Sequence, residues 1–237
     1  MTLNKNIVSH NFGKKVREYD ENSRLQRRVA HELLARSKGI GGQVLDIGAG
    51  TGFIRNNTDL DLIEVDISPT VCKRNGGDII CADAESLPFA DNSFDSIISS
   101  LTFQWCDDVK AATEAYRVLK KKGRLAAATL GSNSLMELKK AGGNTIEFGS
   151  AMKYFAAFKK AGFDKINIDS QKIIYLHDDI YALMNSIKSV GASYPFGKGL
   201  KTKKYFTQLE NIYRAQSSEQ GQLKLTWEVL YISGVKK

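Results

Sequence analysis

Apolar and polar positions along this chain of 237 residues repeat with two periods, one typical of helices and one of short buried strands. Between residues 11 and 37 the apolar side chains recur at helical spacing, which predicts one or two leading helices. Short apolar runs bounded by turn residues then predict five strands, at 43–47, 60–66, 78–81, 94–99 and 124–129. Helices are expected between them, one from Ser68-Pro69, where proline suits the first helical position, and one near 108–119.

The second half of the chain has longer helical stretches and fewer strands. Helices are expected near 150–161, 178–189 and 200–216, and strands at 165–169 and 225–232. Strands that alternate with helices are typical of an α/β fold with a parallel sheet covered on both faces. We therefore expect a single domain over 1–237, made of leading helices (1–40), a ligand-binding core (41–170), a helical insertion (171–222) and a last strand (223–237).

The turn after the first strand carries the most informative motif. Residues 44–52 read Val-Leu-Asp-Ile-Gly-Ala-Gly-Thr-Gly, and such a turn lets a ligand approach bare backbone. In the dinucleotide fingerprint G-x-G-x-x-G the third glycine would stand at Phe53, but here it comes one residue early, at Gly52. Asp46 would also repel a pyrophosphate and favours a positively charged ligand. The turn therefore fits S-adenosylmethionine better than a dinucleotide.

Residues after the other strands extend this candidate site, because ligands of open parallel sheets bind beyond the carboxyl ends of the strands. Asp66 ends the second strand 20 residues after Asp46, about where an acid accepts ribose hydroxyls. Asp83 and Ala84 follow the third strand, where a carboxylate and a backbone N–H can meet adenine. Ser99 and Ser100 follow the fourth strand, beside the expected methionine part.

Each of these residues also has an ordinary structural interpretation. The glycines could simply allow a helix to pack closely, Asp66 could cap the helix near Ser68, and Asp83 could be a turn acid. Their order after successive strands favours the ligand site.

Composition and charge narrow the function further. The net charge of +8 is unevenly placed, since residues 1–120 carry 15 Lys and Arg against 17 Asp and Glu, and residues 121–237 carry 19 against 9. The basic half is either a solvated face or a docking surface for an acidic partner. Binding to nucleic acid is not expected, because no zinc module or aromatic-interleaved arginine cluster is present.

No stretch approaches 18 consecutive apolar residues, and no secretory signal opens the chain, so we expect no membrane span. The three cysteines lack metal spacing, which predicts reduced thiols, a cytoplasmic location and no metal.

From end to end the chain resembles the class I S-adenosylmethionine-dependent methyltransferases, and more narrowly the malonyl-acyl-carrier-protein O-methyltransferases of biotin synthesis. The residues that carry the resemblance are Phe12-Gly13-Lys14 to Tyr19-Asp20, Leu25-Gln26-Arg27, 82–89, 100–108, Thr129-Leu130-Gly131, 135–138, 187–193 and 226–231. The glycine motif alone identifies only the superfamily. The Gln104-Trp105 segment and the two C-terminal segments identify the narrower family.

The resemblance implies a Rossmann-like sheet, mostly parallel with an antiparallel last strand. It also implies a helical lid built from the N-terminus and from the insertion. The implied reaction is methylation of the free carboxylate of malonyl-acyl carrier protein, giving the methyl ester that primes pimeloyl synthesis. A carboxylate is already ionised near pH 7, so no general base is needed.

The resemblance also assigns roles to individual residues. Tyr19 and Gln26 would close over the methionine end, and Gln104 and Trp105 would wall the substrate channel. The predicted cofactor contacts are Gln26, Asp46, Gly48, Ala49, Gly50, Asp66, Ile67, Asp83, Ala84, Ser99 and Ser100. The predicted docking lysines for the acidic carrier protein are Lys139, Lys140, Lys188, Lys201, Lys203 and Lys204. A monomer is expected.

Two departures from the family pattern and three other functions stay open. Only residues 53–59 separate the glycine turn from the second strand, so the first core helix is expected to be short. The family's Pro-Gly-Gly before the fifth strand is Lys121-Lys122-Gly123 here, which we expect to change only a turn. The alternatives are a methyltransferase for another small acid, one for a quinone, and a methyltransferase-like assembly factor for a respiratory complex.

Overall fold

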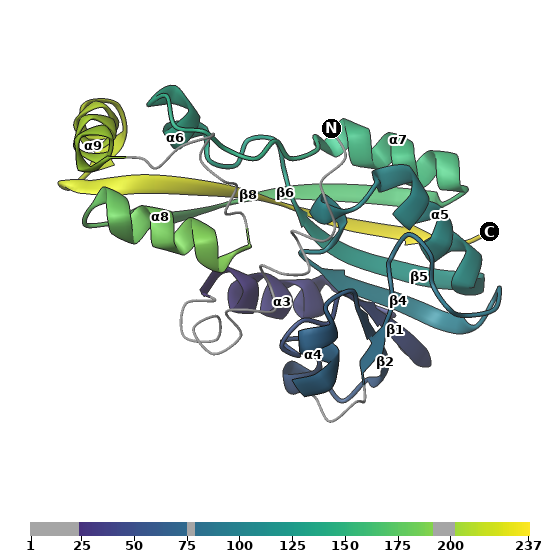
Figure 1. Ribbon diagram of the computed structural model, residues 1–237. Coiled ribbons are helices and arrows are strands. Elements are labelled where there is room, and N and C mark those ends of the chain that lie inside the picture. The colour runs from purple at the N-terminus through teal and green to yellow at the C-terminus, as the bar shows by residue number, and fades with distance from the viewer. Residues whose placement is uncertain (1–23, 75–78, 192–201) are drawn as a thin grey trace.

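The structure is a computed structural model that describes residues 24–74, 79–191 and 202–237. Its centre is a mixed sheet with the strand order β3-β2-β1-β4-β5-β8-β6, and the short β7 pairs with β8 (Figure 1). The strands are β1 (Gln43–Ile47), β2 (Asp61–Asp66), β3 (Ile79–Cys81), β4 (Phe94–Ser100), β5 (Leu119–Leu130), β6 (Asp164–His177), β7 (Ser218–Glu219) and β8 (Gln222–Val235). The first five pair in parallel, and β8 runs antiparallel to both β5 and β6. The predicted mostly parallel sheet with an antiparallel last strand is confirmed.

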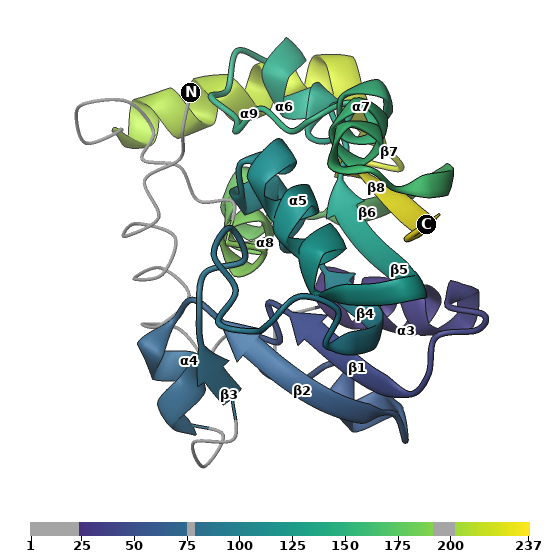
Figure 2. The ribbon, with the colours of Figure 1, turned by 90° about the vertical axis from the view of Figure 1, so that its right-hand side faces the viewer.

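Helices cover both faces of this sheet, as predicted. They are α3 (Arg24–Arg36), α4 (Pro69–Arg74), α5 (Asp108–Val118), α6 (Met136–Lys140), α7 (Ala151–Ala161), α8 (Ile180–Ser189) and α9 (Lys203–Ser217), with short 3-10 turns η1 (Arg55–Asn57) and η2 (Phe103–Trp105). Figures 1 and 2 show α5 and α7 together on one face and α3 on the other. The β6–β8 pair extends beyond the other strands, with α6 and α9 on one side and α8 on the other.

Side chains that alternate along the central strands build a core on each face. Leu45 and Ile97 belong to the apolar cluster beneath α5 and α7, whereas their neighbours Val44 and Ile98 belong to the cluster beneath α3. All four are essentially inaccessible to solvent. Strands buried on both faces read as continuous apolar runs, which is why the sequence predicts them well.

Local capping explains where several helices begin. Asp107, Ser150, Asp179 and Thr202 each accept a hydrogen bond from the backbone N–H three residues later, at the starts of α5, α7, α8 and α9. The end of α7 at Gly162, which has a φ of 109°, also matches the expectation.

The structure differs from the sequence prediction mainly in the second half. β6 continues to His177, so residues 171–177 of the expected helical insertion belong to the sheet. β5 begins at Leu119 rather than near 124, and the chain passes through Lys122 with a φ of 64°. The expected short first core helix is confirmed, because the 53–59 segment holds only η1. In the described part of the chain, no helix combines the length and apolar character needed to cross a lipid bilayer.

Candidate functional site

A pocket opens where the chain leaves the carboxyl ends of β1, β2, β3 and β4. Most of the predicted cofactor contacts line it, and Trp105, predicted for the substrate channel, lines it too. The predicted residues on its wall are Gln26, Gly48, Ala49, Gly50, Asp66, Ile67, Asp83, Ala84, Ser100 and Trp105. The order of strands had placed these residues at one edge of the sheet, and the structure brings them together.

The glycine turn gives the pocket its backbone wall. Gly48, Gly50 and Gly52 all have positive φ, at 78°, 55° and 84°. A Cβ at Gly48 would lie 2.0 Å from Thr102 Oγ1, so close packing as well as conformation requires glycine there. A Cβ at Gly50 would meet only the Gly48 carbonyl oxygen, at 4.0 Å. Gly50 therefore leaves open space in which a ligand can reach the backbone.

Asp66 ends β2 and holds the turn in place. Its Oδ2 accepts from Gly50 N–H at 3.0 Å, and its Oδ1 accepts from Ser68 N–H at 2.8 Å. Burial raises the pKa of Asp66, and these two hydrogen bonds oppose that rise. The bond to Ser68 N–H closes a turn just before α4, and the same side chain lines the pocket. A carboxylate has enough lone pairs to serve both the turn and a ligand hydroxyl.

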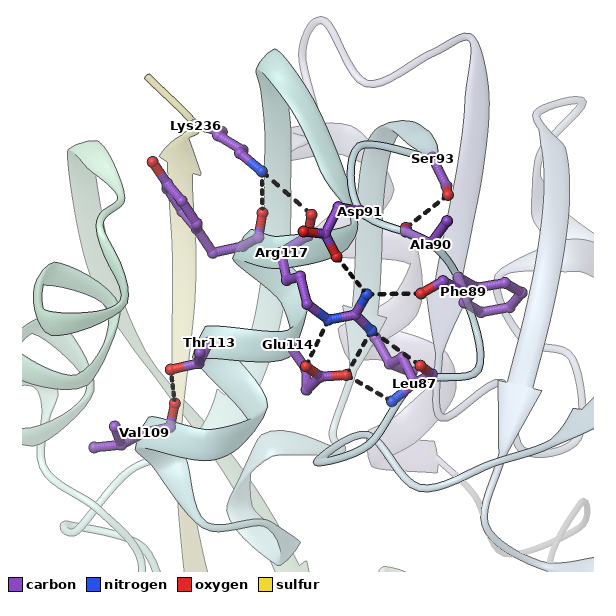
Figure 3. A network of polar contacts seen from close by, with 11 residues as sticks. Leu87, Phe89, Ala90, Asp91, Ser93, Val109, Thr113, Glu114, Arg117 and Lys236 are labelled. Atoms are coloured by element: carbon purple, nitrogen blue, oxygen red, sulfur yellow. Dashed lines mark hydrogen bonds and ion pairs between the residues drawn. The ribbon is translucent and has the colours of Figure 1, made fainter.

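Asp83 likewise combines a structural contact with a place on the pocket wall. Its Oδ1 accepts from Glu85 N–H at 3.0 Å, the geometry of a turn acid. The loop that follows is anchored to α5, because the Arg117 guanidinium donates to the carbonyl oxygens of Leu87 and Phe89 and pairs with Glu114 (Figure 3). These pairings raise the pKa of Arg117, so the anchor stays charged.

Asp46 lies behind the pocket wall and is completely buried. Burial and the nearby Asp66 carboxylate raise its pKa to about 7, and Arg55 opposes the rise. Neither carboxylate oxygen has a hydrogen-bond partner among the described residues. Its register partner on β2 is Glu64, which is also buried and forms an ion pair with Arg55. Asp46 thus places a buried acid with a raised pKa beneath the glycine turn.

Two residues of the sequence could have indicated this charge arrangement. Glu64 is a charged residue at an inward position of a buried strand, and such a residue usually has a partner. Arg55 is the one basic residue of the short 53–59 connection.

Like Asp46, the predicted residues Ser99 and Gln104 lie off the pocket wall. Ser99 is buried and its hydroxyl donates to the Ile47 carbonyl oxygen at 2.8 Å, which ties β4 to the end of β1. Gln104 donates from Nε2 to the Leu101 carbonyl oxygen at 2.6 Å and accepts from Thr129 Oγ1 at 2.8 Å. Its amide is used inside the protein, so Gln104 supports the turn that carries the pocket residue Leu101.

Residues from distant parts of the chain also line the pocket. Trp105 packs edge-to-face on Phe148, with ring centroids 6.5 Å apart. Gln26 of α3 lines the pocket, and so does Val190, the residue that follows α8. Tyr19 lies outside the described residues. Sequence reasoning missed Val190 as well as Thr51 and Thr102, two small polar residues of loops that follow β1 and β4.

The predicted docking lysines divide between two sides of the β6–β8 extension. Lys139 and Lys140 belong to α6, and Lys203 and Lys204 begin α9, which packs against α6. Lys188 lies on α8, across the β6–β8 pair, and is exposed. Lys201 lies outside the described residues. Lys140, Lys203 and Lys204 are exposed, and Lys139 is partly buried.

Comparison with known proteins gives the family. The profile described as "Methyltransferase domain" matches residues 45–127, the segment from β1 to β5. A malonyl-[acyl-carrier protein] O-methyltransferase from Herminiimonas arsenicoxydans is 31% identical over 99% of this chain and 97% of its own length. One from Methylococcus capsulatus is 33% identical over 81% of this chain and 78% of its own length.

A solved structure of similar shape supports the fold. The S-adenosylmethionine-dependent methyltransferase from Thermotoga maritima, described as a possible histamine N-methyltransferase, superposes with a TM-score of 0.60 at 21% identity. The alignment covers 96% of this chain and 99% of that one. By its identity to the Herminiimonas and Methylococcus enzymes, the chain belongs to the malonyl-[acyl-carrier protein] O-methyltransferase family of S-adenosylmethionine-dependent methyltransferases.

Proposed function

We propose that this methyltransferase esterifies the free carboxylate of a malonyl thioester carried by acyl carrier protein, giving the methyl ester that primes pimeloyl synthesis for biotin. The observation that carries the proposal is the match, over 99% of the chain, to a relative named for that reaction. A cytoplasmic location belongs to the proposal, because Cys72, Cys81 and Cys106 are free thiols.

The charges around the pocket suit a cationic nucleoside. Asp66 would accept the ribose hydroxyls, and Asp83 with Ala84 would meet the adenine. The methionine part would then lie along Gly48 and Gly50, above the buried carboxylate of Asp46. When bound, S-adenosylmethionine supplies an activated methyl group on a positively charged sulfur. The same carboxylates would repel the phosphates of a dinucleotide.

The chain's own contribution to catalysis is placement and exclusion of water. The acceptor carboxylate is ionised near neutral pH, so no residue has to remove a proton. Apolar side chains of Leu101, Trp105 and Val190 line the pocket and would keep the reacting atoms dry. Neither His31 nor His177 is among the described residues that line this pocket, as a reaction without a general base allows.

The basic half of the chain supports an acidic protein as the carrier of the substrate. Residues 121–237 carry 19 Lys and Arg against 9 Asp and Glu. Exposed lysines on α6, α8 and α9 lie on the β6–β8 extension, and Val190, which follows α8 directly, lines the pocket. Complementary charge of this kind accelerates encounter in a salt-dependent way.

The proposed reaction is tested with methyl-labelled S-adenosylmethionine and a choice of acceptors. Malonyl-acyl carrier protein, malonyl-coenzyme A, free malonate and a quinone precursor are supplied in parallel. Label should enter a base-labile ester, with the carrier protein preferred. The variant Asp66→Ala, which removes the expected ribose acceptor, serves as the inactive control. If the quinone precursor accepts label and no malonyl thioester does, the proposed substrate is wrong.

The carrier-docking surface is tested by charge reversal at the start of α9. The double variant Lys203→Glu/Lys204→Glu should raise the KM for the carrier protein about tenfold at low salt and flatten its salt dependence. Cofactor affinity should not change. The matched control is Lys159→Glu/Lys160→Glu, which makes the same charge change at exposed positions of α7. Equal effects of both pairs would point to net charge alone and contradict docking at α9.

A further inference from the structure

Gln26 connects the pocket to α8, the helix that ends just before the pocket residue Val190. The side chain is only 5% exposed and lines the pocket from α3. Its Nε2 donates to the carbonyl oxygen of Ser189, the last residue of α8, at 2.8 Å. The two residues are 163 positions apart in sequence, so this hydrogen bond links the leading helix to the insertion.

The nitrogen and the oxygen of the Gln26 amide therefore have different roles. A carbonyl oxygen can only accept, so the amide nitrogen must be the end that faces Ser189. The amide oxygen is then left as an acceptor. It is buried and has no hydrogen-bond partner among the described residues. A ligand that supplies an N–H donor beside Gln26 would satisfy this oxygen, and the α-ammonium of the proposed cofactor is such a donor.

The carbonyl that Gln26 holds lies at a sensitive point of the insertion. The last carbonyls of a helix have no partner within the helix, so a side chain that donates to one of them fixes the helix end. Val190 follows directly and lines the pocket. Leu183 and Ile187 of α8 belong to the same apolar cluster as Leu25 and Val29 of α3. A shift of the Gln26 amide would consequently move the end of α8, the helix that also carries Lys188.

We propose that Gln26 couples occupancy of the cofactor pocket to the position of α8, so that bound cofactor strengthens binding of the carrier protein. This inference rests on the proposed function, because it takes the cofactor and the carrier as the two ligands. The ligand ammonium orients the amide oxygen, and the oriented amide nitrogen holds the end of α8. Coupling of this kind is reciprocal, so the carrier must strengthen cofactor binding by the same factor.

Substitutions at Gln26 can separate the two ends of the amide. Gln26→Glu keeps an acceptor for the ammonium but places a carboxylate oxygen where Ser189 needs a donor. Gln26→Met preserves most of the volume and removes both polar contacts. The matched control is Gln43→Glu, the same substitution at an exposed position where β1 begins, at the opposite end of that strand from the glycine turn.

The measurement is the affinity of fluorescently labelled malonyl-acyl carrier protein with and without saturating S-adenosylhomocysteine, which retains the ammonium and cannot react. In the wild type and in Gln43→Glu, the nucleoside should tighten carrier binding about five- to tenfold. Gln26→Glu should bind the nucleoside within about threefold of wild type, while the tightening falls to one. Gln26→Met should lose nucleoside affinity at least tenfold and lose the coupling too.

Hydrogen exchange of residues 180–191 gives an independent readout that does not need the carrier. Protection there should rise with S-adenosylhomocysteine in the wild type and stay unchanged in Gln26→Glu. Full coupling in Gln26→Glu, or none in the wild type, would overturn the inference. Failure of the wild type to bind or methylate the carrier would instead contradict the proposed function.

Discussion

Replacing Asp46 by asparagine should stabilise the protein while removing its affinity for the cofactor. Asp46 is completely buried beside Glu64, and burial raises its pKa from 3.8 to about 7. Because the folded-state pKa exceeds the unfolded value, the folded chain binds this proton more tightly than the unfolded chain does. The contribution to stability is therefore complete below pH 3.8 and is lost as the pH rises through about 7.

The size of the effect follows from the two pKa values. The difference between 3.8 and about 7 corresponds to about 4 kcal/mol. Most of it, about 3 kcal/mol, is lost between pH 5 and pH 8. Asparagine resembles the protonated acid in shape and charge. Asp46→Asn should match the wild type near pH 4 and exceed its unfolding free energy by about 3–4 kcal/mol at pH 8.

Urea unfolding of both proteins without cofactor, at pH 5 and pH 8, measures this difference. A suitable control is Asp95→Asn, because hydrogen bonds from Lys120 and Gln43 lower the pKa of Asp95. The contribution of Asp95 is present above its unfolded pKa and lost only below it, so this control should lose the same stability at both pH values. Parallel pH dependence in wild type and Asp46→Asn would refute the argument.

The same substitution should abolish the stabilisation that the cofactor gives. Burial removes the Asp46 carboxylate from water, and a ligand cation above it would replace the lost hydration. Asparagine is uncharged and cannot attract the cation in this way. Stability would thus rise as function is lost, the trade-off expected of a site that is strained without its ligand. A rise in Tm with cofactor that is equal in Asp46→Asn and wild type would remove Asp46 from the site.

Two further substitutions separate packing from binding. Gly50→Ala should lower the unfolding free energy by only about 1–2 kcal/mol, because the φ at this position is positive, yet it should lower nucleoside affinity more than tenfold. Gly48→Ala should cost clearly more, since its Cβ would also meet Thr102. Equal stability losses in a urea titration would contradict this distinction. Arg55→Met should lower the unfolding free energy by up to about 3 kcal/mol because buried Glu64 loses its ion-pair partner, and adding Glu64→Gln should restore most of the loss. No recovery in the double variant would show that Arg55 acts otherwise.

The sheet and the pocket edge could be predicted because they depend on local pattern and strand order. Apolar runs of the right length identify strands that are buried on both faces, whatever packs against them. Once those strands are parallel, Asp66 and Asp83 must arrive at one edge, whichever turn contacts they also make. Both residues line the pocket and also hold their turns.

Other features depend on contacts between segments that are distant in the sequence, and the pattern of apolar and polar residues does not predict those contacts. Residues 169–172 of β6 read Asp-Ser-Gln-Lys and resemble a loop, yet they pair with β8 as the edge of the sheet. Ser99 and Ser100 are adjacent and chemically identical. Only the direction of each side chain decides that Ser100 faces the pocket and Ser99 bonds to Ile47.

The polar groups left unmatched at this site point to one kind of ligand. Asp46 contributes two buried oxygens and Gln26 one, and none of the three accepts a hydrogen bond from a described residue. Both groups therefore favour a ligand that brings positive charge and N–H donors, and a phosphate would add further acceptors instead. Asp46 would respond to the charge on sulfur and Gln26 to the ammonium. Since S-adenosylhomocysteine retains the ammonium and lacks the sulfonium charge, methyl transfer would weaken the attraction to Asp46 and leave the contact with Gln26 in place.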